Sequence, residues 1–393
     1  MKFKLTNKIG RISASQTMAV AEAATRLREK GLDVVDFGPG EPDFPTPENI
    51  KQAGIRAIED NFSKYTAAGG IKELKEVIVE KHARDLGSAY DLNEVLVNVG
   101  GKHSVFSIFS ALVDDGDEVI IPTPYWVSFA DITRYVGAIP VFVHTHEEEG
   151  FRLTADMVEA AITPKTRLLI VNSPNNPSGA VLDDDEFVRI AKLCLNRNVI
   201  LLSDECYAYF LYDGRKPFSI ASQADLRETI VVAGSLSKTY AMTGWRIGYV
   251  LGASILIKGI TKLQSHSTSN PVSMAQKAAI EALKGPQDSV AEMLEEYGHR
   301  RRYVVDRLRA IPGVQCPEPG GAFYAYPNVS SAFALGIKDI VDWSVQLLEK
   351  YQVAVVPGVA FGTREHVRIS YAASMEDLEK GLDRIEKFMS ELT

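Results

Sequence analysis

The chain has 393 residues, of which 46% are hydrophobic and 24% charged, a composition typical of a globular protein with roughly two or three domains. Acidic residues outnumber basic ones by 51 to 43, and the formal net charge of −8 argues against nucleic acid or an anionic membrane as a partner. No apolar run approaches the ~18 residues of a membrane span, and the first residues lack the apolar core of a signal peptide. Because the 3 cysteines are widely spaced and form no CxxC pair, we expect a cytoplasmic protein without disulfides or a zinc site.

The first 45 residues predict one helix and little other regular structure. Residues 1–14 are expected to form an N-terminal arm, and the apolar positions of 17–30 have the spacing of an amphipathic helix. We assign 15–45 to a small domain that is completed by the C-terminal part of the chain.

The middle of the chain alternates short β-branched runs with helical patterns. Strands are predicted at 94–99, 118–121, 140–143, 167–171, 198–202, 229–233 and 245–250. Continuous apolar strands separated by helices are typical of a mostly parallel sheet that is buried on both faces. Residues 46–285 are therefore expected to form a large α/β domain around a seven-stranded sheet.

The C-terminal residues 286–393 predict the remainder of a smaller α+β domain. Helices are expected at 289–310, 337–350 and 375–389, with short strands at 322–326, 353–356 and 366–371. The basic cluster 299–302 lies within the first of these helices, and we interpret it as a solvated face.

Polar, aromatic and glycine residues gather where the strands of the large domain end. These segments are 100–103, 123–126, 172–179, 203–207 and 234–238. Ligands of open α/β sheets bind outside the carboxyl ends of the strands, so these segments form the candidate site.

An anion is the first ligand group that these segments suit. The backbone N–H groups of Gly101 and Lys102 open a predicted helix, which is a common phosphate site. Ser235 and Arg246 add a hydroxyl and a guanidinium donor.

A flat ring that carries a carbonyl group is the second ligand group that these segments suit. Trp126 can stack on a ring, and a buried Asp204 requires a cation such as a protonated ring nitrogen. Asn176 and Tyr207 can hydrogen-bond a phenolic oxygen, and Lys238 can form a Schiff base with an aldehyde. Pyridoxal phosphate carries all of these groups.

Each of these residues also has an ordinary interpretation. Asp204 can be a helix cap or a member of a buried ion pair, Trp126 a core residue and Lys238 a surface lysine. Other ligands are less well supported, because the chain has no P-loop and no complete dinucleotide fingerprint, and we expect no metal at His144 and His146.

Several motifs extend the pattern along almost the whole chain. They are 40–44 (Gly-Glu-Pro-Asp-Phe), 64–65, 99–102, 124–126, 172–179 (Asn-Ser-Pro-Asn-Asn-Pro-Ser-Gly), 203–205, 235–249 (Ser-Leu-Ser-Lys-Thr-Tyr-Ala-Met-Thr-Gly-Trp-Arg-Ile-Gly-Tyr), 320–324 and 367–371. In these motifs the chain resembles fold-type I pyridoxal-phosphate aminotransferases of class I, in particular the bacterial aspartate branch that includes aspartate/prephenate aminotransferases.

The resemblance implies a role for each candidate residue. Lys238 would hold the cofactor as a Schiff base and shuttle a proton, and Asp204 would keep the ring nitrogen protonated. The other cofactor contacts would come from Gly101, Lys102, Trp126, Asn176, Tyr207, Ser235 and Arg246. Tyr65 would reach the phosphate of the neighbouring subunit, which implies a homodimer with shared sites. Arg368 would clamp the substrate α-carboxylate, with Gly40 as a backbone donor and Trp126 and Asn176 alongside.

The resemblance also bears on the substrates. Lys102 matches the lysine that recognises a distal carboxylate in this branch, and Thr17 matches a nearby hydroxyl of the N-terminal segment, which favours a ping-pong reaction between aspartate and 2-oxoglutarate. The alternative is that Lys102 merely begins a helix near the phosphate. The segment 13–15 (Ser-Ala-Ser) departs from the family pattern at the substrate entrance. An aromatic, prephenate or broad-specificity aminotransferase therefore remains an alternative, followed by a pyridoxal-phosphate-dependent lyase.

Overall fold

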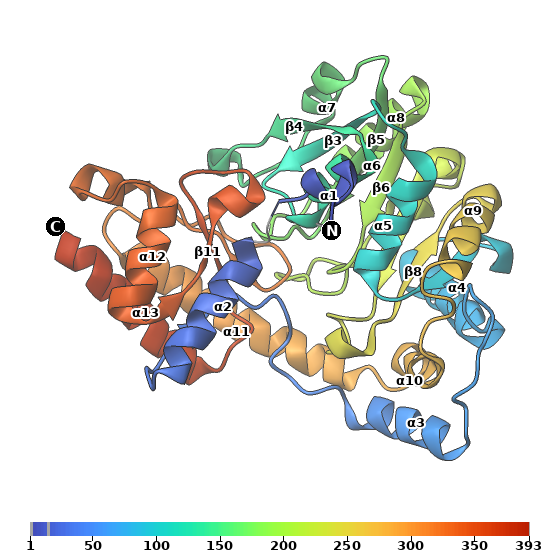
Figure 1. Ribbon diagram of the computed structural model, residues 1–393, viewed down its shortest axis with the longest axis horizontal. Helices are drawn as coiled ribbons and strands as arrows, with labels where there is room; N and C mark the ends of the chain where they lie inside the picture. The colour runs from blue at the N-terminus through green and yellow to red at the C-terminus, as the bar shows by residue number, and fades with distance from the viewer. Residues whose placement is uncertain (1–2, 14–15, 393) are drawn as a thin grey trace.

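The computed structural model describes residues 3–13 and 16–392, with side chains described from residue 18 onward in the second range (Figure 1). Its largest element is a seven-stranded sheet in the order β2-β8-β7-β6-β5-β3-β4. The strands are β2 (Val95–Asn98), β3 (Glu118–Thr123), β4 (Ile139–His144), β5 (Thr166–Asn172), β6 (Ile200–Asp204), β7 (Ile230–Ser235) and β8 (Gly248–Leu251). All seven predicted strands are thus present, in one mostly parallel sheet.

One strand of this sheet, β8, runs against its neighbours. It pairs antiparallel with both β2 and β7. The segment between β7 and β8 contains a single 3₁₀ turn, η5 (Thr243–Trp245), which is followed by Arg246 with a φ of 57°. Because this connection contains no crossover helix, the chain folds straight back beside β7. The predicted strand at 245–250 accordingly begins only at Gly248.

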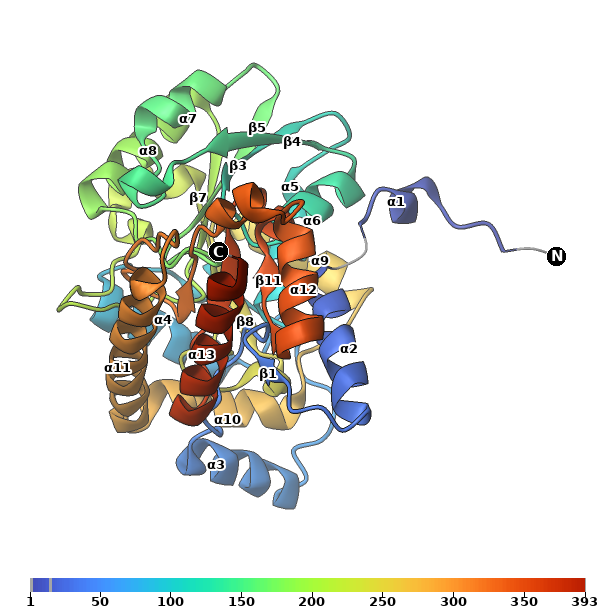
Figure 2. The ribbon, with the colours of Figure 1, turned by 90° about the vertical axis from the view of Figure 1, so that its left-hand side faces the viewer.

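Helices cover both faces of the sheet (Figures 1 and 2). One face packs against α3 (Glu48–Glu59), α4 (Lys72–Leu86), α7 (Ala155–Ala161), α8 (Asp184–Arg197) and α10 (Ser273–Lys284), the other against α5 (Gly101–Leu112), α6 (Ser128–Val136) and α9 (Ser254–Ser265). Leu168 and Leu169 are consecutive in β5, belong to opposite cores and are both 0% exposed. This two-sided burial explains the continuous apolar strands. Among the helices of residues 3–13 and 16–392, none is long and apolar enough to cross a membrane.

A second, smaller part has its own core. Its helices are α2 (Gln16–Glu29), α11 (Asp288–Ala310), α12 (Ile340–Tyr351) and α13 (Met375–Leu392). A three-stranded sheet has the order β11 (Val356–Pro357), β12 (Val367–Ser370) and β9 (Tyr324–Ala325), and β1 (Val35–Asp36) pairs with β10 (Val353–Ala354). The predicted strand at 353–356 is therefore two short strands in different sheets. The short strand β1 was not predicted.

The interpretation of the basic cluster 299–302 as a solvated face was wrong for two of its four residues, since His299 and Arg302 are exposed but Arg300 and Arg301 are buried. Arg300 and Arg301 are only 7% and 3% exposed. Arg300 Nη1 donates to both carboxylate oxygens of Asp43, each at 2.8 Å, and Arg301 donates to Asp213 at 2.8 Å. Both guanidinium groups are buried because each is paired with a carboxylate.

Candidate active site

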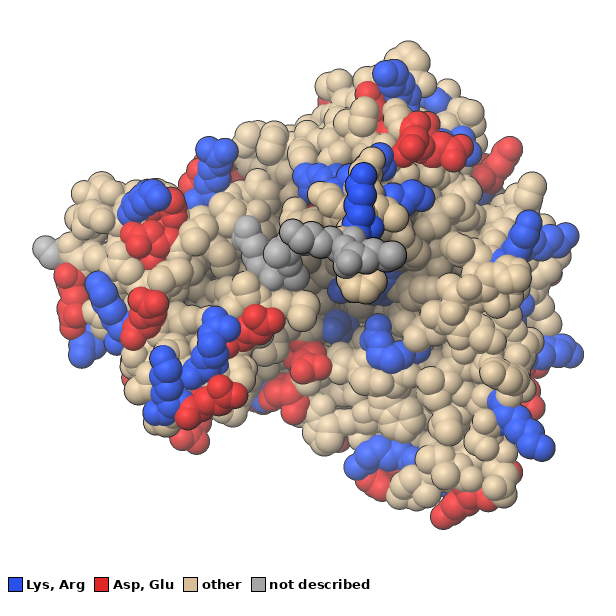
Figure 3. Space-filling model, in the orientation of Figure 1, with Lys and Arg blue, Asp and Glu red and all other residues tan. Residues whose placement is uncertain are grey.

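A cleft of about 1240 Å³ lies where the carboxyl ends of the large sheet face the smaller part. The space-filling view shows the molecule hollowed near its centre, with basic side chains in the hollow (Figure 3). The sequence-predicted residues that line the cleft are Gly40, Gly101, Lys102, Trp126, Asn176, Asp204, Tyr207, Ser235, Lys238, Arg246 and Arg368. Residues that are far apart in the chain thus meet in one cavity.

Lys238 follows β7 and points across the cleft. Its Nζ donates a hydrogen bond to the carbonyl oxygen of Gly40. Burial lowers the pKa of Lys238 below that of an exposed lysine, although the nearby Cys206 and Glu41 partly oppose the shift. A lowered pKa increases the fraction of neutral amine, which is the form that acts as a nucleophile or a base.

Asp204 is the last residue of β6 and is buried at the bottom of the cleft. Its carboxylate accepts a hydrogen bond from the backbone N–H of Cys206 at 3.1 Å. Burial raises the pKa of Asp204 to about 6. A buried carboxylate with so little compensation favours a cationic ligand group next to it.

An anion cradle is formed where α5 begins beside β8. Gly100, with a φ of 84°, precedes the helix, and Gly101 and Lys102 of its first turn, whose N–H groups have no partner within the helix, line the cleft. A Cβ atom at Gly100 would lie 2.3 Å from Arg246 Nη2, so the guanidinium crosses directly over this turn. Ser235 adds a hydroxyl, which accepts from the N–H of Ser237 at 3.1 Å. These donors converge as a phosphate group requires.

Lys102 and Trp126 form one wall of the cleft. Lys102 Nζ lies 5.2 Å from the centroid of the indole ring, a cation–π distance. Burial lowers the pKa of Lys102, and the charge of Arg246 lowers it further. Trp126 also contacts Phe129 edge-on, at 5.3 Å between ring centroids. The ring thus lies between the core and the cleft.

Arg368 lies in β12 and reaches across to the large sheet. Its Nη1 donates to Asn176 Oδ1 at 3.0 Å, and its Nη2 donates to the carbonyl oxygen of Gly38 at 2.5 Å. Within residues 3–13 and 16–392, these hydrogen bonds go to uncharged oxygens only, and the side chain is buried. A buried guanidinium without a carboxylate partner suits an anionic ligand.

Tyr207 has a neighbour to which the sequence analysis gave no role. The hydroxyl groups of Tyr207 and Tyr324 are 2.7 Å apart, and both rings are buried. Tyr324 also packs against Gly40, where an added Cβ would lie 2.7 Å from its hydroxyl. The 320–324 motif was noted as part of the resemblance, but its residue types alone do not indicate which side chain reaches the site.

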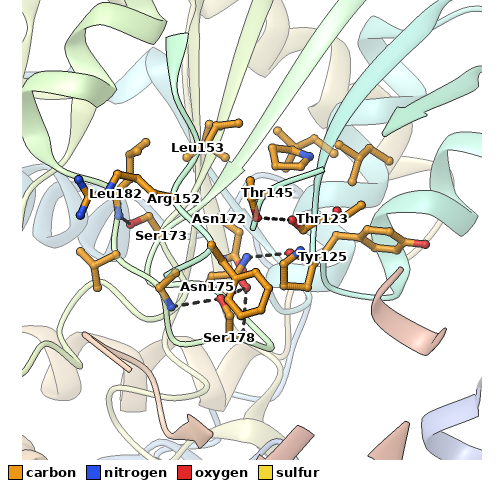
Figure 4. A pocket seen from close by; sticks show the side chains of 18 of the residues that line it. Thr123, Tyr125, Thr145, Arg152, Leu153, Asn172, Ser173, Asn175, Ser178 and Leu182 are labelled. Atoms are coloured by element: carbon orange, nitrogen blue, oxygen red, sulfur yellow. Dashed lines mark hydrogen bonds between the residues drawn. The ribbon is translucent and has the colours of Figure 1, made fainter. Parts of the chain in front are cut away.

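Hydrogen bonds behind the cleft hold the loop that carries Asn176. Asn172 Oδ1 accepts from the N–H of Asn176 at 2.9 Å, and Asn175 Nδ2 donates to the carbonyl oxygen of Pro124 at 3.3 Å. Ser178 Oγ donates to Asn175 Oδ1 at 2.8 Å. Figure 4 shows Asn172, Asn175 and Ser178 among the side chains that line a second, small pocket. The loop is therefore supported from behind, which fixes Asn176 relative to Arg368.

The 38–44 segment, which contacts both Lys238 and Arg368, is held by α11. Arg300 binds the carboxylate of Asp43 as described above, and Tyr297 donates to the same carboxylate at 3.2 Å. The aspartate of the Gly-Glu-Pro-Asp-Phe motif therefore has a positioning partner far away in the sequence. A composition-based interpretation of the basic cluster missed this pair.

Some predicted residues lie elsewhere. Tyr65 does not line the cleft, and its side chain is 90% exposed. Residues 14 and 15 and the side chain of Thr17 lie outside the described residues. Ser13 lies at the mouth of the cleft, where its N–H donates to Asp131 at 3.3 Å.

The fold and the cleft together define an α/β enzyme whose site combines a buried lysine, a buried carboxylate and an anion cradle. The chain belongs to the aminotransferase class I and II family, whose model matches residues 32–385. The predicted family, the α/β fold with its seven-stranded sheet and aminotransferase activity are confirmed, and the family implies dependence on pyridoxal phosphate.

Individual relatives match over the whole length. The chain is 44% identical to an aspartate aminotransferase of Geobacillus stearothermophilus over 388 residues, which cover 98% of this chain and 99% of the relative. It is 42% identical to a probable aspartate/prephenate aminotransferase of Aquifex aeolicus, with 100% of both chains covered. Among solved structures, the aspartate aminotransferase of Thermus thermophilus with maleate has a TM-score of 0.94 at 39% identity, with 98% of this chain and 100% of that chain covered.

Proposed function

We propose that this aminotransferase moves the amino group of an L-amino acid, preferably aspartate, to a 2-oxo acid such as 2-oxoglutarate. The observation that carries the proposal is the convergence of Lys238, Asp204 and the anion cradle in one cleft, opposite Arg368. The names of the relatives support an acidic substrate.

The cleft residues fit pyridoxal 5'-phosphate. The anion cradle suits its phosphate, the buried carboxylate of Asp204 suits a protonated ring nitrogen, and Trp126 offers a ring face. The proposed cofactor contacts are Gly101, Lys102, Trp126, Asn176, Asp204, Tyr207, Ser235, Lys238 and Arg246, with Tyr65 of the partner subunit. When bound, the cofactor withdraws electrons from the substrate Cα and carries the amino group between the two acids.

Lys238 is the proposed catalytic base. Its neutral amine, favoured by the lowered pKa, would remove the proton from the substrate Cα. The resulting Lys238 ammonium would then give a proton back to the reacting group on the same face. The hydrogen bond to Gly40 holds the amine over the cleft. Asp204 and Tyr207 act as fixed polar partners of the cofactor. Because both half-reactions use the same groups, a ping-pong cycle follows.

Arg368 is proposed to bind the α-carboxylate of each substrate. A planar guanidinium offers two parallel N–H donors to a carboxylate, and burial strengthens this interaction. Asn176 accepts a hydrogen bond from the guanidinium, and Gly40, where a Cβ would lie 3.7 Å from Arg368 Nη1, is the proposed backbone donor beside it. In this way the substrate Cα is placed beside Lys238.

Lys102 is proposed to bind the distal carboxylate of aspartate. Its ammonium lies beside Trp126 in the same cleft that Arg368 lines. The position of Lys102 in the lining, with its Nζ 5.2 Å from the Trp126 ring, supports this role. A cation in this position selects against neutral side chains, because an unpaired buried charge is costly.

A homodimer is proposed from two exposed apolar features. The loop around Tyr65 is anchored by α10, because Ser273 donates to the Lys64 carbonyl at 2.6 Å, yet the Tyr65 ring is 90% exposed. The N-terminal arm extends away from the body in Figure 2, with Phe3 fully exposed and Leu5 72% exposed. Both features suit burial against a second copy.

We further propose a division into an arm (1–14), a small domain (15–45 and 286–393) and a large domain (46–285). The core around the large sheet supports this division, although the core of the smaller part also takes in Tyr207, Phe210, Tyr212 and Ala241 of the large domain. Limited proteolysis that released a stable fragment with other boundaries would contradict it.

Reductive trapping tests the proposed cofactor site. The protein is incubated with pyridoxal phosphate, reduced with borohydride, digested and analysed by mass spectrometry. The label is expected on Lys238 and absent from a Lys238→Ala variant. A label that persisted on another lysine of the variant at equal yield would overturn the assignment.

A donor panel tests the substrate. Aspartate is expected to have a higher kcat/KM than phenylalanine with 2-oxoglutarate as acceptor. A preference for phenylalanine would instead favour the aromatic alternative.

A further inference from the structure

A buried polar contact joins the two parts of the molecule outside the cleft. Glu147 lies in η2 (Glu147–Glu149), directly after β4 of the large sheet, and His366 immediately precedes β12. His366 Nε2 donates to a carboxylate oxygen of Glu147. Asn328 Nδ2 donates to both oxygens of the same carboxylate, at 3.1 and 2.9 Å. A carboxylate from one part thus receives its donors from the other.

Aromatic rings shield this contact from water. The ring of Tyr326 stacks on the imidazole of His366, with centroids 4.9 Å apart and an interplanar angle of 6°. Phe151, from the large part, meets the imidazole edge-on at 5.3 Å. The side chains of His366 and Glu147 are only 7% and 13% exposed. Because water cannot replace the donors, loss of one of them would leave a buried carboxylate poorly compensated.

The surroundings of His366 favour a neutral imidazole in this contact. Burial lowers the pKa of His366, while Glu147, Glu365 and Glu148 oppose the shift. Its Nδ1 is buried and has no hydrogen-bond partner among the described residues, so a second proton there would be unsatisfied. The contact is therefore a charge-assisted hydrogen bond from a neutral imidazole to a carboxylate.

The same contact is connected to Arg368. Because side chains alternate along a strand, His366 and Arg368 lie on the same side of β12. The guanidinium of Arg368 lies 5.1 Å from the ring of Phe361, which packs against Tyr326 at 6.0 Å. His366, just before β12, binds Glu147 of the large part. Arg368, two residues after His366, binds Asn176 of the large part.

We propose that Glu147, His366 and Asn328 form a latch that holds β12 against the large part and so positions Arg368 for the substrate carboxylate. They are positioning residues, since they act on Arg368 through the strand and the intervening rings. The inference rests on the proposed role of Arg368 in substrate binding.

Glu147→Ala tests the latch, with Glu149→Ala as the matched control. Both substitutions remove a carboxylate from the same 3₁₀ turn, but Glu149 is exposed. Glu147→Ala is expected to raise KM for both the amino acid and the 2-oxo acid by about tenfold, with kcat changed by less than about threefold. The dissociation constant of succinate, a dicarboxylate that cannot react, should rise in parallel. Cofactor absorbance should stay as in the unmodified enzyme.

Further variants separate positioning from general stability. Glu147→Gln keeps an acceptor for His366 and is expected to restore most of the succinate affinity. His366→Ala should raise KM like Glu147→Ala, and the double variant should be little worse than either, because the residues act as a pair. If the Glu147→Ala protein cannot be produced in folded form, Asn328→Ala should also raise KM, by a few-fold.

Two results would overturn the latch. One is a KM for Glu147→Ala that matches the Glu149→Ala control while Arg368→Ala raises KM strongly. The other is a lowered melting temperature with no KM change in any latch variant. An unchanged KM in Arg368→Ala would contradict the proposed function itself, and with it the purpose of the latch.

Discussion

The phenol oxygens of Tyr207 and Tyr324 lie 2.7 Å apart in the buried wall of the cleft, so one hydroxyl donates to the other. Burial raises the pKa of both tyrosines, to about 12 for Tyr324, so both are protonated at neutral pH. Each phenol has one proton to donate. If Tyr324 donates to Tyr207, the proton of Tyr207 is left free to face the cleft.

Tyr324→Phe should therefore impair catalysis through Tyr207. We expect kcat/KM to fall about three- to tenfold for every donor, and the melting temperature to fall because a buried hydroxyl loses a partner worth about 1 kcal/mol. Steady-state kinetics on the two single variants and on Tyr207→Phe/Tyr324→Phe checks this. Strict additivity of the two substitutions would contradict the coupling.

Asp204→Asn should stabilise the cofactor-free protein and inactivate the enzyme. The folded-state pKa of Asp204, about 6, lies above the ordinary value of 3.8. Between these two pH values the folded state therefore binds more protons than the unfolded state. Stability therefore falls as the pH rises from about 4 to 6, by an amount on the order of 3 kcal/mol. Asparagine cannot ionise and avoids this loss.

The measurement is thermal unfolding of the cofactor-free protein from pH 4 to 7. The variant should melt higher than the unmodified protein at pH 7, and the difference should vanish near pH 4. With pyridoxal phosphate bound, the order should reverse, because the carboxylate then has a cation beside it. A variant that melts lower at pH 7 without cofactor would contradict the argument.

Arg368→Lys should weaken the binding of all substrates alike. Lysine keeps the charge but cannot offer two parallel donors to a carboxylate. We expect kcat/KM to fall about 10²-fold for aspartate, phenylalanine and 2-oxoglutarate, mostly through KM. Binding of succinate, followed by titration, should weaken by a similar factor. A loss confined to one substrate would argue against an α-carboxylate site.

Lys102→Met should act selectively. Methionine keeps much of the unbranched side chain and its packing on Trp126 but removes the charge. We expect kcat/KM for aspartate to fall at least about tenfold and that for phenylalanine to stay within about threefold. Equal losses for both donors would place Lys102 at the phosphate rather than at the substrate side chain.

Much of the large sheet could be predicted because a strand that is buried on both faces requires a run of consecutive apolar residues. The continuous apolar run around Leu168 and Leu169 is one example. The direction of β8 leaves no such trace, since an antiparallel strand in a covered sheet is just as apolar as its neighbours. The break at Val355, where one predicted run becomes β10 and β11, is equally invisible, because both short strands are buried.

The site was predictable where a residue's chemistry is rare and its position is at a strand end. Lys238 and Asp204 meet both conditions. Tyr324, Arg300 and His366 do not, because their importance comes from partners that are far away in the chain. Periodicity places a side chain on a face, but it does not say which distant residue that face meets. Arg300 was thus interpreted as an exposed residue, although its guanidinium is paired with the carboxylate of Asp43.

The pair formed by Arg300 and Asp43 has a mechanical consequence. The chain crosses between the two parts just before α3 and again just before α11, and Arg300 fastens the first crossing to the helix that begins at the second. Both crossings therefore share one anchor. Because Asp43 precedes the first crossing and Arg300 follows the second, the pair ties the two connecting segments to each other within the smaller part.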